Sequence, residues 1–296
     1  MLTNKYSIKL IHPYNLKETL HSGQAFRWET INSGEAEATV WHQGIIGNHQ
    51  VRLAQSKTDI HLWATKEYTA TEISRVISYL RIDDDLGKIY SEIQLDKYMK
   101  SAIKKYLGLH ILNQSPWETL ITFICSANNN IPRIRQLVFL MATNFGQKIT
   151  DEFGTFNLFP TSTELHNAGE KALREIGLGF RAKYVSAAAE LDVSNMINVD
   201  DLVDKSYQES LDQLTNIPGV GDKVANCILL FSLNKLEAFP VDVWIKRVLR
   251  EIYIDDTKEI PDTQIRNWAQ KKFGQYSGYV NQYLFHNRRL LEKSIK

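Results

Sequence analysis

The hydrophobic period of the chain changes once, near residue 69. In the first 65 residues, apolar positions alternate with polar ones, and turn-forming residues occupy the segment 44–48. The clearest alternating pairs are Val51 with Leu53 and Ile60 with Leu62. Strict alternation is typical of strands that bury one face. Residues 1 to about 65 therefore predict an antiparallel sheet with its second face in water.

From about Thr69 the apolar positions follow helical spacing, beginning with Ile73, Val76, Ile77 and Leu80. Pro116 is placed to open a helix, since proline is tolerated in a first turn. Further helices are predicted at 131–145, 181–191, 207–214, 222–233, 242–252, 261–273 and 277–291. The pattern predicts an α+β fold, with an N-terminal antiparallel β-sheet domain followed by an α-helical domain. We expect the first domain at 1–107, ending in helices, and the second at 108–296.

Composition fits a globular protein of two domains, with 43% hydrophobic and 23% charged residues in a chain of 296. No apolar run reaches the length of a membrane span, and the N-terminus lacks the apolar core of a secretory signal. We therefore expect no membrane association. The expected location is the cytoplasm, including the nucleoid, or the nucleus in a eukaryote.

The two cysteines, Cys125 and Cys227, are too few for a disulfide scaffold or a four-cysteine iron–sulfur cluster. No histidines stand at the spacing of a zinc site, so no metal held by side chains is expected. The formal net charge is only +1, but residues 215–296 carry 13 basic and 9 acidic residues. That excess weakly favours a surface that binds phosphate.

The most informative segment is LTNIPGVGDKVA, residues 214–225, which lies between two predicted helices. Gly219 and Gly221 allow the backbone to turn sharply and to approach another molecule closely. The next helix begins at about Asp222, so its free N–H groups form a site for an anion such as a DNA phosphate. A plain helix–helix turn is the alternative, but two glycines after a proline favour DNA binding.

Lys223 lies in the first turn of that helix, where the positive end of the helix dipole opposes a cation. A neutral lysine amine is a nucleophile that forms Schiff bases with aldehyde carbons. Taken alone, a solvated surface lysine is the simpler interpretation. Asp242 precedes another helix, and its simplest role is to cap that helix. A fixed carboxylate there can also stabilise positive charge on a sugar as its glycosidic bond breaks. Because both residues stand at the starts of adjacent helices, we expect them to face one cleft.

Four segments in order carry a family resemblance: SGQAFRW at 22–28, FICSANNNIPRI at 123–134, GLGFRAKYVSA at 177–187, and the block IPGVGDKVANCILLFSL followed by AFPVDVWIKRV. Together they resemble the 8-oxoguanine DNA glycosylase/lyase family of the helix–hairpin–helix (HhH-GPD) superfamily, nearly from end to end. The resemblance implies a helix–hairpin–helix motif at about 207–233, with Lys223 as the Schiff-base nucleophile and Asp242 as the essential carboxylate.

The resemblance also implies a base pocket. The Gly23 carbonyl would accept the N7–H that 8-oxoguanine has and guanine lacks. Cys227 and Phe285 would enclose the flipped base. The other implied base-binding residues are Phe231, Pro240 and Asn281. Without the resemblance, each of these would be read as an ordinary core residue.

On the DNA side, the resemblance implies that Asn128 fills the space left by the flipped nucleotide. Arg133 and Arg181 would read the opposite cytosine, and Phe180 would wedge beside it. Backbone groups of Gly219, Val220 and Gly221 would hold phosphate. A structural ion could bind the carbonyls of Thr215, Ile217 and Val220.

Two positions depart from the family pattern. Trp244 stands where much of the family has a histidine that contacts phosphate, so an indole N–H can donate there but no charge is available. Asn281 stands where the family often has a glutamine, and Gln282 follows it directly. These departures concern the affinity for the base and leave the reaction class unchanged.

The predicted function is excision of 8-oxoguanine from double-stranded DNA followed by β-elimination. The prediction includes no cofactor, no obligate protein partner and a monomeric state. Three alternatives remain: a glycosylase for another damaged purine, a non-catalytic helix–hairpin–helix module that binds DNA, and an unrelated helical protein. Lys223 argues against a glycosylase without lyase activity.

Overall fold

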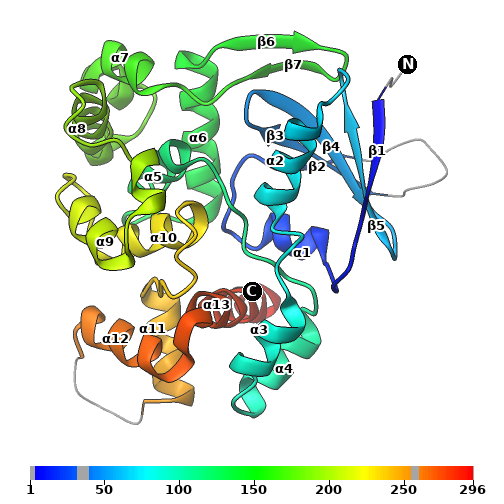
Figure 1. Cartoon of the computed structure of the whole chain (residues 1–296). Helices are drawn as coiled ribbons and strands as arrows, with labels where there is room; N and C mark the ends of the chain where they lie inside the picture. The colour runs from blue at the N-terminus through cyan, green and yellow to red at the C-terminus, as the bar shows by residue number, and fades with distance from the viewer. Residues whose placement is uncertain (1–3, 32–39, 255–259, 296) are drawn as a thin grey trace.

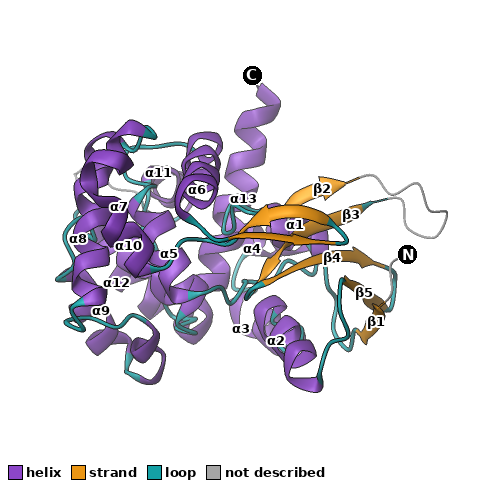
Figure 2. Ribbon diagram, turned by 90° about the horizontal axis from the view of Figure 1, so that it is seen from above, coloured by secondary structure: helices purple, strands orange, loops and turns teal. Residues whose placement is uncertain are grey.

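The computed structural model describes residues 4–31, 40–254 and 260–295. A sheet-containing N-terminal part lies beside a larger helical part, as Figures 1 and 2 show. Both the α+β class and the order of the two parts were predicted from the hydrophobic pattern. Within the described residues, no helix has both the length and the apolar character needed to cross a bilayer.

The N-terminal sheet has five antiparallel strands in the order β1-β5-β4-β3-β2. Their bounds are Asn4–Lys9 (β1), Glu29–Ile31 (β2), Trp41–Ile46 (β3), His49–Gln55 (β4) and Asp59–Ala64 (β5). A short helix, α1 (Leu16–His21), interrupts the region where only strands were predicted. Asn15 caps it by accepting the backbone N–H of Glu18, and Leu16 and Leu20 are buried.

The face of this sheet that was predicted to lie in water is covered in part: Lys5, Ser7 and Lys9 are exposed on it, but its centre is not. One face packs on a core that includes Leu53 and Leu62. On the other, the rings of Trp41 and Trp63 stack with centroids 3.7 Å apart and pack with Phe153. Phe153 belongs to the turn of a hairpin, β6 (Lys148–Asp151) and β7 (Gly154–Asn157), which reaches the sheet from the helical part (Figure 1). The alternation of apolar and polar residues in the first 65 positions could not predict that a hairpin more than 80 residues later in the chain packs on this face.

The helices predicted from Thr69 onward are present with ends within about four residues of those expected. They are α2 (Ala70–Leu80), α5 (Pro116–Ile124), α6 (Ile131–Phe145), α8 (Ala182–Val193), α9 (Tyr207–Thr215), α10 (Asp222–Ser232), α11 (Val243–Ile252), α12 (Asp262–Phe273) and α13 (Ser277–Ile295). The additional helices are α3 (Leu86–Ile93), α4 (Lys97–Lys105) and α7 (Ser162–Glu175), with short 3-10 turns η1 (Gly179–Arg181), η2 (Asp200–Asp204) and η3 (Gly274–Tyr276).

The larger hydrophobic core joins the helices, and it includes α3 and α4 through Leu86, Ile93 and Met99. Leu112, just beyond α4, packs instead with the core of the sheet. The chain thus passes between the two cores more than once. The division at residue 107 remains a prediction.

Candidate active site

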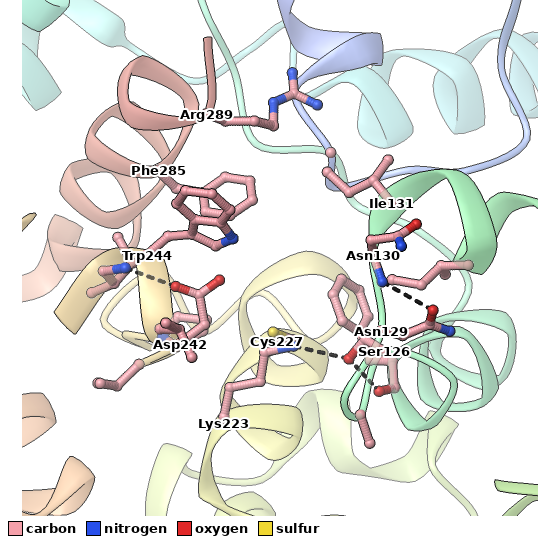
Figure 3. A pocket seen from close by; sticks show the side chains of 18 of the residues that line it. Ser126, Asn129, Asn130, Ile131, Lys223, Cys227, Asp242, Trp244, Phe285 and Arg289 are labelled. Carbon is pink, nitrogen blue, oxygen red and sulfur yellow. Dashed lines mark hydrogen bonds between the residues drawn. The ribbon is translucent and has the colours of Figure 1, made fainter. Parts of the chain in front are cut away.

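A cavity of about 740 Å³ lies where the two parts meet. Five segments contribute most of its wall: the turn before β2, the loop between α5 and α6, one side of α10, the start of α11, and part of α13. Representative residues are Gly23, Asn128, Lys223, Cys227, Asp242, Asn281 and Phe285. Figure 3 shows the side chains of Lys223, Asp242 and Phe285 around one space. The expectation that Lys223 and Asp242 share a cleft agrees with this placement.

Lys223 lies in the first turn of α10, is half-buried and lines the cavity. Its Nζ donates to Ser126 Oγ at 2.9 Å and lies 5.4 Å from the centre of the Phe123 ring. The Ser126 hydroxyl donates in turn to the Phe123 carbonyl at 2.6 Å (Figure 3). Because that proton is committed, the hydroxyl presents a lone pair to the amine and fixes its position.

Asp242 caps α11, as its position in the sequence suggested. Its side chain accepts the Ile245 backbone N–H at 2.8 Å. Burial raises the pKa of the Asp242 carboxyl, and the hydrogen bond from Ile245 and the nearby Lys223 charge oppose that rise only in part. The cap therefore does not decide the ionisation of this carboxyl alone. The influence of Lys223 on this pKa shows that the two groups are electrostatic neighbours.

A buried asparagine connects the helix that carries Lys223 to the segment that leads to Asp242. Asn226, on α10, accepts from the backbone N–H of Phe239 and from the hydroxyl of Tyr207, and it donates to the Asp222 carbonyl. Arg266 of α12 donates to the same hydroxyl and pairs with Asp222 at 3.2 Å. The segment that leads to Asp242 is thus held against the helix that carries Lys223.

The predicted base-binding side chains lie around the cavity. Cys227 is buried, and burial raises the pKa of its thiol to about 11, so it presents a neutral, apolar wall. Phe231 stacks on Phe123, with centroids 5.5 Å apart. Asn281 is buried and donates to the Pro240 carbonyl at 2.8 Å.

Gly23 forms the edge of the cavity in a left-handed conformation, with φ of +91°. A Cβ there would lie 3.0 Å from Ile131 and 3.3 Å from Phe285, and the positive φ would strain any other residue. The next residue, Gln24, is fully buried and fixes the turn. Its amide donates to the carbonyls of Thr19 and His110 and accepts from the backbone N–H of Leu112.

The DNA-facing candidates gather on the loop before α6 and on η1. Asn128 is exposed with φ of +48°, and Phe180 is 45% exposed. Arg181 donates to the Ala127 and Asn128 carbonyls. Arg133 donates to the Gly177 carbonyl at 2.9 Å and to Gln136. In this state the two arginines hold the loop and the turn that carry the exposed side chains.

The glycine turn joins α9 to α10, as predicted for a helix–hairpin–helix motif. Gly219 has φ of +84°, Val220 donates its N–H to the Ile217 carbonyl, and Gly221 stands at the N-cap of α10 without a capping side chain. The described residues contain no group of three His, Cys, Asp or Glu able to hold a metal. A backbone ion at the Thr215, Ile217 and Val220 carbonyls remains a prediction.

Several cavity residues were not singled out from the sequence. Ser126, Ile131, Gln282 and Arg289 all line the cavity. Ser126 and Ile131 lie inside a segment that carried the family resemblance, so their motif was a signal. Arg289 continues the α13 stripe of Asn281 and Phe285 at intervals of four residues. Trp244 also lines the cavity, with the Arg247 guanidinium 5.4 Å from its ring centre.

Comparison with known proteins identifies two consecutive domains. Residues 8–120 match the family described as 8-oxoguanine DNA glycosylase, N-terminal domain. Residues 121–274 match the HhH-GPD superfamily of base excision DNA repair proteins. The N-glycosylase/DNA lyase of Saccharomyces cerevisiae is 30% identical over 308 aligned positions, which cover 91% of this chain and 82% of the yeast protein.

Two solved structures resemble the whole chain. The structure of MBOgg1 in complex with a low-affinity DNA ligand has a TM-score of 0.89 at 34% identity, covering 98% of this chain and 97% of that one. The Clostridium acetobutylicum 8-oxoguanine glycosylase/lyase, bound to double-stranded DNA with cytosine opposite 8-oxoguanine, has a TM-score of 0.86 at 29% identity, covering 99% and 100%. This chain is therefore a member of the HhH-GPD superfamily of base excision DNA repair proteins, in the N-glycosylase/DNA lyase family with an 8-oxoguanine DNA glycosylase N-terminal domain.

Proposed function

We propose that this protein is a bifunctional DNA glycosylase and AP lyase that excises 8-oxoguanine from double-stranded DNA and then nicks the strand. The observation that carries the proposal is the amine of Lys223 and the carboxyl of Asp242 in the wall of one cavity of about 740 Å³. That volume accommodates a flipped nucleotide, and the proposed chemistry uses no redox or organic cofactor.

In the proposed complex the flipped base lies between Cys227 and Phe285. The Gly23 carbonyl accepts the N7–H of 8-oxoguanine. Guanine would present a lone pair to that acceptor instead, so the intact base is disfavoured. Asn281 and Gln282 line the cavity, and to donate to the Watson–Crick edge the Asn281 amide would have to give up its bond to the Pro240 carbonyl.

The chemistry begins with the unprotonated Lys223 amine. Its Nζ bonds to C1′ as the C1′–N9 bond breaks, and the electron pair leaves with the base, which takes up a proton. The Asp242 carboxylate stabilises the positive charge that develops on the sugar. Opening of the sugar ring gives a Schiff base. Loss of a C2′ proton then breaks the C3′–O bond, with the electron pair leaving on the 3′ phosphate, and water releases the lysine.

DNA would be held by the glycine turn and by the loop before α6. Asn128 and Phe180 are already exposed, which suits residues that fill or wedge a duplex. To read an opposite cytosine, Arg133 and Arg181 would have to exchange carbonyl partners within the protein for the base. A protein with this substrate acts wherever DNA lies, in the nucleoid or the nucleus, and we propose that it does so as a monomer.

Borohydride trapping on an 8-oxoguanine duplex tests the proposal. The wild-type protein should form a covalent complex with the DNA, and Lys223→Gln should form none. Lys246→Gln is the matched control, because Lys246 also lines the cavity but pairs with Asp262 at 2.5 Å. The control should trap as the wild type does.

Asp242→Asn separates an enzyme from a binding module. We expect the single-turnover excision rate to fall by at least about 100-fold, since a charge that stabilises the transition state is lost. Unchanged product yield would favour a different carboxylate, and absence of product from the wild type would favour a non-catalytic module. Equal excision of alkylated purines would favour the other substrate class.

A further inference from the structure

A second, smaller cavity opens beside the base pocket. It has a volume of about 380 Å³ and shares Gly23, Ile131, Pro132 and Arg289 with the pocket. Its other lining residues are His21, Ala25 and Arg135. We call it the arginine notch. In Figure 3 the Arg289 side chain reaches from α13 across the top of the pocket towards Ile131.

Arg289 enters the notch without a carboxylate beside it. Its Nη2 donates to the His21 carbonyl at 2.7 Å and lies 3.1 Å from His286 Nδ1. Glu18 pairs with His286 Nε2 at 2.5 Å, and its charge also acts on Arg289, but no ion pair joins Glu18 to the guanidinium. The Arg289 Nε is buried with no hydrogen-bond partner. Burial lowers the pKa of this guanidinium, which reflects the cost of holding its charge there.

Arg135 supplies a second cation to the same notch. Its Nη2 donates to the Trp28 carbonyl at 3.0 Å, and no ion pair is formed by Arg135 or Arg289 within the part of the chain that the structure describes. His21 adds no charge at neutral pH, because burial, followed by the field of Arg135, lowers its pKa below the usual 6.5. The notch therefore presents two guanidinium groups, neither in contact with a carboxylate, although the charge of Glu18 acts on Arg289 from farther away.

Two guanidinium groups favour an oxyanion over a neutral acceptor. Guanidinium donors are arranged to match phosphate or carboxylate oxygens in pairs, whereas one carbonyl oxygen of a base would leave most of these donors unpaired. Among the groups that DNA carries, the phosphodiester is the anion. A nucleotide flipped into the pocket brings its neighbouring phosphates within a nucleotide's length of the shared rim. On the other side of the pocket, Trp244 supplies no charge to a phosphate.

We propose that the arginine notch binds a backbone phosphate of the DNA next to the flipped nucleotide, through Arg135 and Arg289 together. The inference rests on the proposed function, since DNA must enter the pocket for the notch to meet it. It adds a second phosphate site to the one proposed at the glycine turn.

The test measures DNA binding by fluorescence anisotropy over a series of KCl concentrations, in the Lys223→Gln background so that no strand is cut. Two duplexes are compared, one with 8-oxoguanine and one with a tetrahydrofuran abasic analogue. Arg135→Gln with Arg289→Gln should weaken binding to both duplexes alike. The slope of log K against log salt should fall by about 0.9, the value for one lost phosphate contact.

Two further variants keep the result interpretable. Arg75→Gln removes an exposed arginine of α2 that lines neither cavity, and it should leave the slope unchanged. Arg289→Lys keeps the charge and should retain most of the slope even if the bonds to His21 and His286 are lost. Circular dichroism and Tm confirm that each variant is folded, and Arg135→Gln alone serves if the Arg289 variants are not.

An unchanged slope in the double variant overturns the inference. So does a loss confined to the 8-oxoguanine duplex, because that result assigns the notch to the base. Borohydride trapping by the protein with native Lys223 is scored separately. If the protein with native Lys223 forms the covalent complex but the double variant leaves the salt slope unchanged, only the proposed phosphate site in the arginine notch is refuted. If the double variant changes the salt slope but the protein with native Lys223 forms no covalent complex, only the proposed function is refuted.

Discussion

At the level of single residues, sequence reasoning proposed two reactive groups that line one cavity, but not the partners that position them. Lys223 and Asp242 could be singled out because each stands in a local pattern, a glycine turn before one and a helix start after the other. Ser126 could not, because its contact with Lys223 joins residues 97 positions apart. The same holds for Arg289, whose neighbour His21 lies 268 positions away. Such contacts depend on how distant segments pack.

Ser126 gives a prediction at this scale. Without its hydroxyl, the Lys223 amine would sample more rotamers before it attacks. Ser126→Ala should therefore lower kcat for excision by about tenfold, equivalent to about 1.4 kcal/mol, while KM stays nearly constant. Steady-state kinetics on an 8-oxoguanine duplex measure the split.

Ser126→Thr keeps a hydroxyl at the same place and should restore most of the rate. If Ser126→Thr loses as much of kcat as Ser126→Ala, or if only KM changes, Ser126 does not position the amine for the reaction.

At the level of elements, helices with strong local signals were predicted well. Pro116 opens α5, and the apolar pattern gave both ends of α6. The β6–β7 hairpin was missed because its strands have four residues each, too short for alternation to be recognised. α1 was missed because a six-residue helix fits inside a strand-like pattern. α3 and α4 were missed although their apolar faces join the large core.

The turn between α9 and α10 gives a prediction for an element. Gly219 has a left-handed φ, which a residue with a Cβ rarely adopts, and a Cβ there would lie 2.5 Å from the Tyr184 ring. Gly219→Ala should therefore lower the free energy of unfolding by at least about 1–2 kcal/mol. Gly221 has φ of −89° and open space around it, so Gly221→Ala should cost less than about 1 kcal/mol. Urea unfolding of the two variants measures the difference, and equal losses would contradict the strain argued for Gly219.

At the scale of the whole molecule, a buried histidine makes the stability of the fold depend on pH. His110 is fully buried, stacks on Tyr14 and donates from Nδ1 to the Gly108 carbonyl at 2.9 Å. Its carbonyl accepts from Gln24, which fixes the Gly23 turn. Burial lowers the pKa of His110 to about 3. Its neutral ring is therefore part of the frame that holds the pocket edge.

The sign of the pH effect follows from that shift. The pKa is about 6.5 in the unfolded chain and about 3 in the folded one, so protonation favours unfolding. Stability is fully present above pH 6.5 and falls as the pH drops from 6.5 towards 3, by up to about 1.4 kcal/mol per pH unit. His110→Asn should show a shallower fall between pH 6.5 and 5 in urea unfolding. Parallel curves for the two proteins would rule out this source of acid sensitivity.

The stripe of α13 has a consequence for how such an enzyme can change. Asn281, Phe285 and Arg289 follow one another along a single helix, whereas the proposed nucleophile lies on α10 and the proposed carboxylate caps α11. Part of the predicted base contact is thereby carried by a helix that bears neither predicted reactive group, although Cys227 and Phe231 share α10 with Lys223. We expect substitutions along that stripe to change how a base is held in the pocket while both predicted reactive residues stay in place.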